Sequence, residues 1–348
     1  MGKRRRVAFN YRSKKLANLY KVPFATFYLS NPPEKKTKAY TDRRTYNDTV
    51  YRETSYELWS EIGRITGNRQ IIVNLSDDTE YRSLPSVGPK LSEKQIADVI
   101  RKYFELDLPF KNKSAYRNNG FNYYRALLEH YGIMVAQITG VSLSEMRGIS
   151  MYYDTFPIIA INNKDFERAK VFSLFHEVAH LVRRSSSLCL IDFDERNDEE
   201  EKICDRIAAE VLMPEESFRY VSSNALNLYG EWSDLCLISI ADKYAVSTFS
   251  VVRRLRELDI INRSDYYSIY KRISDSFKEE QDSIIQNKKD REFKVKYYIT
   301  YLSKEGYLFP KKVLSAYSRG DISYGEMCST LSIKGKHISN IERAVMFI

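Results

Sequence analysis

The sequence predicts a mostly helical α+β fold with one small sheet, flanked by helical domains that resemble helix-turn-helix units. Helical spacing of apolar residues is regular from residue 92 onwards. Two short runs rich in β-branched residues, Ile133–Ile138 and Pro157–Ile161, favour strands. A composition of 43% hydrophobic and 29% charged residues is typical of a globular protein. Together these three observations predict helices arranged around a sheet of few strands.

The first 90 residues carry weaker patterns. An apolar run over 22–29 ends at Pro32 and Pro33, which stop any regular element. Beyond it we expect, in chain order, a polar linker over 34–52, a helix around 53–66, a short strand near Ile71–Leu75 and a boundary at Pro85–Pro89.

The middle of the chain alternates helices and strands. Ser92, with Glu93 behind it, fits the N-cap of a helix that ends near Tyr103. The further helices of this region are expected over 122–131, closed by Gly132, over 165–181, and over 199–212, halted by Pro214.

Two later segments have the apolar spacing of helix-turn-helix units. In the first, residues 237–247 and 251–258 supply the helices, and Ser247 fits the cap after the turn. A weaker unit pairs 321–333 with 338–345, and a charge-mixed helical stretch over 266–303 lies between the two units.

A chain of 348 residues is long enough for several domains. The patterns predict four of them: a basic tail with an N-terminal accessory region over 1–90, a core of helices and a small sheet over 91–225, a helix-turn-helix-like domain over 226–265 and a helical C-terminal domain over 266–348.

The positive charge of the chain belongs mostly to its N-terminal end. The chain has 55 Lys and Arg against 46 Asp and Glu, a net charge of +9. The first 21 residues hold eight basic residues and no acid, so the rest of the chain is close to neutral. A nucleic-acid or acidic partner is therefore expected only at this tail.

Several classes of protein are excluded by pattern. No apolar run is long enough for a transmembrane helix, and the basic start is not followed by the apolar stretch of a secretory signal. The cysteines are scattered and form no CxxC pair, so we expect reduced thiols in a cytoplasmic protein. They are Cys189, Cys204, Cys236 and Cys328.

One motif carries chemistry. His176, Glu177 and His180 form an HExxH sequence inside a predicted helix. Residues four apart lie on one helix face, so both imidazoles can bind one metal ion. Glu177 lies about 100° round the helix, beside the ion, where it can act as catalytic general base. Against this stands the simpler interpretation that two histidines pack against the core.

A second helix offers the third metal ligand. Glu201 and Asp205 are again four residues apart, and this spacing favours Glu201 as the ligand and Asp205 as the acceptor of the far N–H of a ligating histidine. Glu199 and Glu200 are rival ligands. Cys204, next to Asp205, is expected to face another side of the helix and to pack.

At these residues the sequence resembles a known family. Residues 172–181 resemble the catalytic helix of ImmA/IrrE-type metallopeptidases, and Glu201–Pro214 resembles their second signature, which ends in Leu-Met-Pro. Cys204 stands where the family usually has alanine, and Ile207 where an aromatic residue is common. The resemblance covers roughly residues 92–220. Residues 16–33 resemble only the end of the repressor-type module that long members carry.

The resemblance implies a zincin-like peptidase core and a site-specific endopeptidase. Its usual substrate is a helix-turn-helix transcriptional repressor or cognate regulator, in a stress, mobile-element or phage-related response. The metal is expected to be Zn²⁺, although Mn²⁺ or Fe²⁺ also suits two histidines and a glutamate. Zn²⁺ would polarise the scissile carbonyl while Glu177 activates the water.

Substrate contacts are less constrained. The oxyanion could be stabilised by a residue drawn from Tyr152, Tyr153, Arg147 and His130. The predicted strand could be an exposed edge that accepts an extended substrate, or a buried core strand. Its residues are Ile158, Ile159, Ala160 and Ile161.

A different class of function stays open. The basic tail and the helix-turn-helix-like units also fit a DNA-binding transcriptional regulator whose metal site is structural or vestigial. An antitoxin-like or phage-defence protein acting on a cognate partner is a third hypothesis. No membrane partner is expected, and any DNA contact of the peptidase would be weak and made by the tail.

Overall fold

The computed structural model describes residues 55–76, 83–88, 90–106, 120–184, 198–288 and 296–346, all within one unit of the chain, residues 40–348. The basic tail, the apolar run and the linker predicted before residue 53 lie outside the described residues. The predicted domain boundaries stay a prediction.

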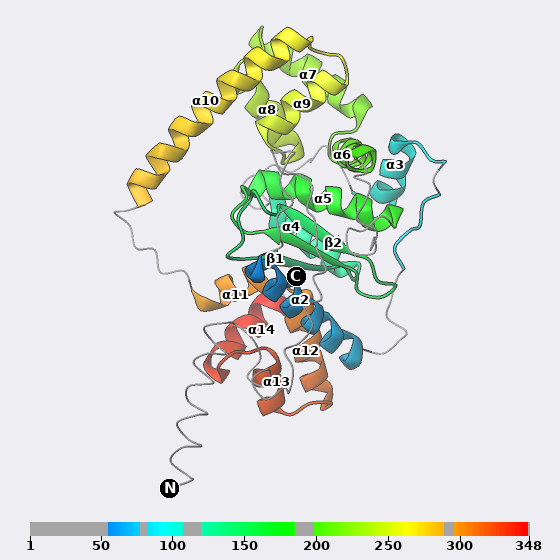
Figure 1. Ribbon diagram of the computed structural model, residues 1–348, viewed down its shortest axis with the longest axis vertical. Coiled ribbons are helices and arrows are strands. Elements are labelled where there is room, and N and C mark those ends of the chain that lie inside the picture. The colour runs from blue at the N-terminus through cyan, green and yellow to red at the C-terminus, as the bar shows by residue number, and fades with distance from the viewer. Residues whose placement is uncertain are drawn as a thin grey trace, which may run out of the picture. The chain divides into compact units, whose positions relative to one another are not determined.

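A three-stranded mixed sheet lies at the centre of this unit. Its strands are β1 (Met134–Ile138), β2 (Gly148–Met151) and β3 (Ile158–Asn162), in the order β1-β3-β2. β1 runs parallel to β3, and β2 runs antiparallel to it. Every strand residue is buried, because helices cover both faces (Figure 1). The mostly helical α+β fold with a small sheet is confirmed.

The strand order corrects one prediction. The strand over 158–161 is not an edge: β3 is hydrogen-bonded to β1 on one side and to β2 on the other. Its backbone groups are therefore already paired and cannot accept a substrate chain. The run is continuously apolar because both of its faces are buried, which is the pattern of an interior strand.

One face of the sheet carries the helices α4 and α5. Side chains of alternate strand residues, among them Val135, Ile159 and Ile161, enter the apolar core on this side. The helices in this part of the unit are α3 (Glu93–Tyr103), α4 (Gly120–His130), α5 (Glu167–Arg183), α6 (Asp198–Leu212), α7 (Glu215–Tyr229), α8 (Asp234–Tyr244), α9 (Thr248–Glu257) and α10 (Arg263–Lys288).

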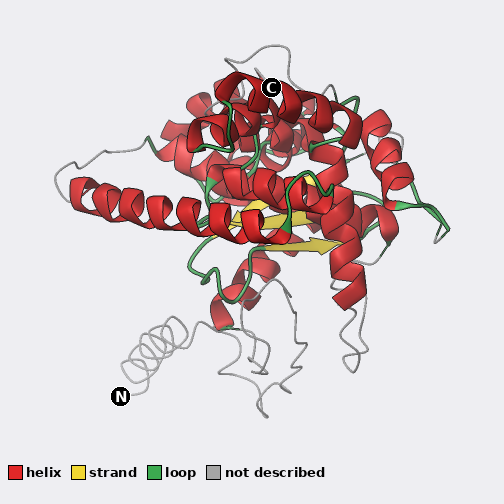
Figure 2. Ribbon diagram, turned by 90° about the horizontal axis from the view of Figure 1, so that it is seen from above, coloured by secondary structure: helices red, strands yellow, loops and turns green. Residues whose placement is uncertain are grey.

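The opposite face is covered by segments from both ends of the chain. Met134, Ala136 and Ile158 enter a second apolar core here. α2 (Tyr56–Leu75) lies beside α12 from the C-terminal part, although more than 200 residues separate the two helices (Figure 1). Figure 2 shows the strands with helices around them. The C-terminal helices are α11 (Tyr297–Glu305), α12 (Leu308–Arg319), α13 (Tyr324–Thr330), the 3-10 helix η3 (Gly335–His337) and α14 (Ile338–Met346).

The structure lengthens the first helix and removes a predicted strand. Residues 71–75 are the last turn of α2 rather than a strand. Ile72 continues the buried stripe of Leu58, Ile62 and Ile65, whose spacing is helical. A five-residue apolar run alone did not distinguish a strand from a buried helix end.

The helix starts predicted from caps are confirmed. Ser92 and Gln95 form a capping box at α3. Ser247 caps α9 through the backbone N–H of Ser250. The predicted helical stretch over 266–303 is two helices, α10 and α11.

Among the described residues, no single helix is both long and apolar enough to cross a membrane. α8 and α9 reach that length and composition only as a pair, and they are bent by 93°.

Candidate metal centre

The HExxH residues lie in the buried middle of α5. His176, Glu177 and His180 are 1%, 3% and 4% exposed. The helix turns both imidazoles to one side, so that the Nε2 atoms of His176 and His180 are 3.0 Å apart. Two nitrogens of the same kind therefore face each other in a buried position.

The third donor comes from α6, which packs along α5. One carboxylate oxygen of Glu201 lies 3.3 Å from Nε2 of His176, and the other lies 3.6 Å from Nε2 of His180. The ligand atoms of the three residues all lie within 4.8 Å of one another. Two helices thus bring a His₂Glu donor set to one point.

These distances fit a tetrahedral metal ion. Donor atoms bound at ~2.0 Å around one such ion are about 3.3 Å from each other. The three separations around His176, His180 and Glu201 are close to that value. Imidazole and carboxylate donors suit Zn²⁺, and with three protein ligands one position stays open, as in catalytic zinc sites.

The charge of the centre favours a cation. Burial would raise the pKa of Glu201, but hydrogen bonds with His176 and His180 outweigh it and hold that pKa well below its usual range. Burial would likewise lower the pKa of His180, but Cys204 and Glu201 outweigh it and raise that pKa. The carboxylate is therefore ionised, and a metal ion can replace protons on the imidazoles.

The ring nitrogen of His176 that faces away from Glu201 contacts an acidic residue. Nδ1 of His176 lies 2.8 Å from Oδ1 of Asp205. A carboxylate at this distance keeps the proton on Nδ1, which leaves Nε2 free for a metal and makes it a better donor. Asp205 lies where the spacing predicted it.

The second histidine has a partner that sequence spacing missed. Sγ of Cys204 lies 3.5 Å from Nδ1 of His180, and Cys204 is fully buried. The expectation that Cys204 faces away from the centre is wrong. Residue 204 lies one residue from Asp205 but three residues from Glu201, and a separation of three keeps two side chains on one helix face.

The rival acids are placed differently. Both oxygens of Glu200 accept hydrogen bonds from Arg183, each at 2.7 Å, and Glu199 accepts one from Arg206 at 3.1 Å. Glu200, with His180 and Cys204, also satisfies the geometry of a second donor set.

The buried carboxyl of Glu177 lies against β2. A Cβ atom added to Gly148 would be 2.7 Å from Oε1 of Glu177, so any larger residue at this position would displace that carboxyl. The role of Gly148 was not predicted, because the contact joins residues far apart in the sequence.

The oxyanion candidates have partners of their own. Arg147 pairs with Asp165 at 3.4 Å, and the hydroxyl of Tyr152 donates to Asp154 at 2.6 Å. The guanidinium of Arg184 lies 3.7 Å from the centre of the Tyr152 ring, and that of Arg69 lies 3.6 Å from the Tyr153 ring. His130 is exposed at the end of α4, with its ring against Tyr131.

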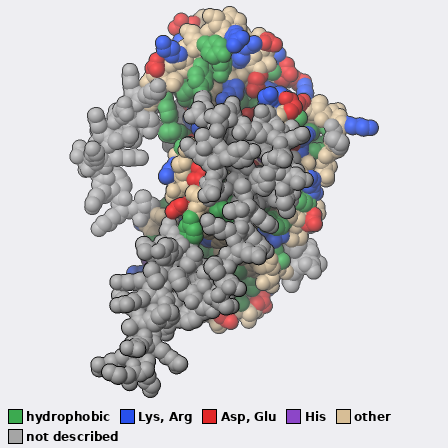
Figure 3. Space-filling view, viewed as in Figure 1, with side chains coloured by type: hydrophobic (Ala, Val, Ile, Leu, Met, Phe, Trp, Pro, Cys, Tyr) green, Lys and Arg blue, Asp and Glu red, His purple; other side chains and the backbone are tan. Residues whose placement is uncertain are grey.

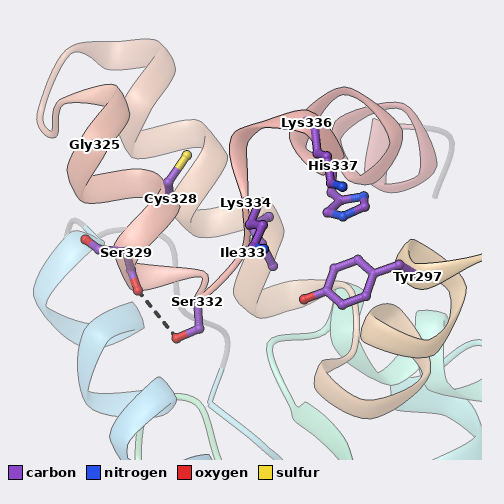
Figure 4. A pocket seen from close by; sticks show the side chains of 9 residues that line it. All are labelled: Tyr297, Gly325, Cys328, Ser329, Ser332, Ile333, Lys334, Lys336 and His337. Atoms are coloured by element: carbon purple, nitrogen blue, oxygen red, sulfur yellow. Dashed lines mark hydrogen bonds between the residues drawn. The ribbon is translucent and has the colours of Figure 1, made fainter.

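A surface hollow of about 700 Å³ lies elsewhere, between α11, α13 and η3. Figure 4 shows the rings of Tyr297 and His337 on one side of it and Cys328 on the other. It shares no residue with the His₂Glu set. The hollow is therefore separate from the candidate metal centre.

Comparison with known proteins agrees with the geometry. Residues 128–256 match the family model Peptidase_M78, described as the IrrE N-terminal-like domain. The matched range contains all three strands and the whole of α5 and α6. Comparison with curated proteins finds no significant match.

Proposed function

We propose that this protein is a zinc-dependent endopeptidase of the ImmA/IrrE kind, because residues 128–256 match the model of that peptidase family. One observation carries the proposal. Two buried imidazole Nε2 atoms, on the helix that also carries the buried Glu177, converge with one partly buried carboxylate on one point. The three ligands would be His176, His180 and Glu201, and the same donors also suit Mn²⁺ or Fe²⁺.

When bound, Zn²⁺ lowers the pKa of a water molecule towards neutrality and polarises the carbonyl of a peptide bond. The chain's own residues supply the proton transfer. The carboxylate of Glu177 accepts the proton of the attacking water and then gives it to the nitrogen of the leaving amine. Asp205 holds His176 in the tautomer that leaves its Nε2 unprotonated.

The position of Gly148 indicates where a substrate chain would run. β2 is the outer strand next to Glu177, whereas β3 is enclosed between its two neighbours. An extended peptide that pairs with this sheet beside Glu177 would have to pair with β2. We assign the substrate class by family resemblance: a helix-turn-helix repressor or cognate regulator, cut at one bond.

Replacing the proton acceptor tests the mechanism. Glu177→Gln keeps the size and hydrogen-bonding shape of the side chain but removes its basicity. We expect at least a hundredfold loss of peptide cleavage, on the order of the loss for a general base, with bound zinc unchanged. Cleavage of a candidate repressor is measured by mass spectrometry, and zinc by elemental analysis.

The control is Glu216→Gln on α7, where the carboxyl is almost fully exposed and lies outside the centre. This variant should cleave as the wild type does. Undiminished cleavage by Glu177→Gln would show that Glu177 is not the base.

A further inference from the structure

We propose that Cys204 is a positioning residue of the metal centre: its sulfur accepts the N–H of His180 Nδ1 and so orients the Nε2 of that histidine towards the ion. The inference rests on the proposed function, since it assigns a role within the same site. It concerns this chain in particular, because the family that the sequence resembles usually has alanine at this position.

The first observation is a parallel between the two histidines. Nδ1 of His176 meets Asp205, and Nδ1 of His180 meets Sγ of Cys204. Consecutive residues of α6 thus reach the far nitrogens of both imidazoles, while both Nε2 atoms face Glu201. The Nδ1 atom of each histidine therefore contacts a residue of α6, the helix that also supplies the third ligand.

The second observation is that the sulfur of Cys204 has a further contact, with Glu200. Sγ of Cys204 lies 3.8 Å from Oε1 of Glu200, in position to donate its S–H to that carboxylate. Both oxygens of Glu200 are bound by Arg183, which lies three residues after His180 on α5. Contacts therefore run from His180 through Cys204 and Glu200 to Arg183, between α5 and α6.

The chemistry of imidazole explains how these contacts would support metal binding. A neutral histidine carries one N–H, and when Nε2 binds a metal that N–H is on Nδ1. In a buried site an N–H without an acceptor costs about 1–3 kcal/mol. Cys204 is fully buried and His180 is 4% exposed, and the sulfur lies 3.5 Å from Nδ1, in position to accept that N–H.

Sulfur is a weaker acceptor than a carboxylate, so the two histidines are held unequally. Outer partners of ligating histidines are typically worth 10- to 100-fold in metal affinity. For a thiol we expect the lower end, about tenfold. The contribution of Cys204 to the Zn²⁺ affinity should depend on its hydrogen bond to His180 and not on the volume of its side chain.

The test measures Zn²⁺ affinity by competition with a chromophoric chelator. Cys204→Val keeps an apolar side chain of similar size but cannot accept the N–H, and we expect it to weaken Zn²⁺ binding about tenfold. Cys204→Ser keeps donor and acceptor, and its affinity should stay within about threefold of the wild type. Cys204→Ala is the second variant without an acceptor, should the valine prevent folding.

The matched control is Cys236→Val. Cys236 is also a fully buried cysteine, but it lies on α8, outside the two donor sets. Its affinity for Zn²⁺ should equal that of the wild type. Thermal unfolding of the metal-free variants shows whether each is folded.

The outcomes separate this inference from the proposed function. If the wild type binds no more Zn²⁺ than His180→Ala does, the proposed function as a zinc-dependent peptidase is wrong. If the wild type binds tightly and a folded Cys204→Val or Cys204→Ala binds equally well, only the role of Cys204 is overturned.

A spectrum of the Co²⁺-loaded protein distinguishes positioning from ligation. His180, Glu200 and Cys204 could together hold an ion through the thiolate. In that case Co²⁺ would show a sulfur-to-metal charge-transfer band that Cys204→Ser loses. We expect no such band, and its presence would overturn the positioning role.

Discussion

At the scale of single residues, the contact between Gly148 and Glu177 sets the position of the candidate base. A methyl group at residue 148 would overlap the carboxyl, with 2.7 Å to Oε1 and 3.2 Å to Cγ of Glu177. Gly148→Ala should therefore displace Glu177 and lower peptide cleavage by 10- to 100-fold, the order of loss expected for a misplaced catalytic group. Zinc content should stay unchanged, because the three donor atoms lie on α5 and α6.

Gly67→Ala is the control for this glycine. Gly67 lies within α2, and an added Cβ would meet nothing within 4 Å. Alanine favours a helix over glycine by about 1 kcal/mol, so this variant should unfold at a slightly higher temperature and cleave normally. If Gly148→Ala and Gly67→Ala cleave peptides equally well, Gly148 does not set the position of Glu177.

A second buried carboxyl, that of Glu129 on α4, gives the fold a pH dependence. Burial raises its pKa to about 7, although the charge of Arg125 opposes the shift. The ordinary pKa of 4.5 is regained on unfolding, so the folded state binds the proton more tightly. The stability that this proton provides is complete below pH 4.5 and is lost as the pH rises through 7.

We expect the free energy of unfolding to fall by an amount on the order of 3 kcal/mol between about pH 4.5 and 8 because of this group. Glu129→Gln carries no titrating proton, so its stability should vary less with pH in the same window. Urea unfolding of both proteins at several pH values measures the difference. Parallel pH profiles would exclude a contribution from Glu129.

At the scale of elements, contacts at the turn between α11 and α12 fix these C-terminal helices to α4. The backbone N–H of Tyr307 donates to Glu129 at 2.9 Å, and Arg125 donates to the carbonyl of Leu302 at 3.0 Å. Gly306 lies between them with φ of +82° and ψ of −171°, a conformation available almost only to glycine. Its missing side chain leaves room for the carboxyl of Glu129.

Two glycines at helix ends give a matched pair for this turn. Gly320, after α12, also has a positive φ of +85°, but an added Cβ would meet nothing within 4 Å. Gly320→Ala should cost only the backbone strain, about 1 kcal/mol. Gly306→Ala also forces Glu129 aside and should cost more than about 2 kcal/mol. Chemical denaturation measures both, and equal losses would contradict the contact.

The helix-turn-helix-like pair α8 and α9 supports packing more than DNA reading. Arg254, one of three arginines on α9, is 5% exposed, pairs with Glu210 and donates to the carbonyl of Met213. A second arginine of that helix, Arg256, pairs with Asp259. The contacts of Arg254 tie α9 to α6 and to the residue that follows it. They therefore give no support to a base-reading face on α9, as the alternative of a DNA-binding regulator would need.

At the scale of the whole molecule, charge divides the chain. Lys and Arg side chains alternate with Asp and Glu over the described surface on the face drawn in Figure 3. This agrees with a near-neutral charge after residue 21, while the first 21 residues hold eight basic residues. We propose that any DNA contact is made by this tail and is separate from peptide cleavage.

Removing residues 1–21 tests that separation. The chain with residues 1–21 should bind DNA with a steep salt dependence. The chain without them should lose up to about 7 from the slope of log K against log salt concentration. Peptide cleavage should stay within about twofold. If both chains give the same slope, residues 1–21 do not make the DNA contact.

Local spacing predicted much of the centre. His176 and His180 share a face because they are four apart on one helix, and Glu201 and Asp205 share a face of the next. Caps such as Ser92 are equally local, since a hydroxyl reaches an N–H within its own turn. The prediction of a strand over 71–75 was wrong because so short an apolar run fits both the two-residue period of a strand and the end of a buried helix.

The sequence by itself thus determined which residues can act as donors, base and caps, because those properties follow from contacts within a few residues along one helix. Tertiary structure decided that Cys204 meets His180, that Gly148 leaves room for Glu177 and that β3 lies in the middle of the sheet. These depend on how α6 crosses α5 and on strand order, which long-range burial of apolar surface selects.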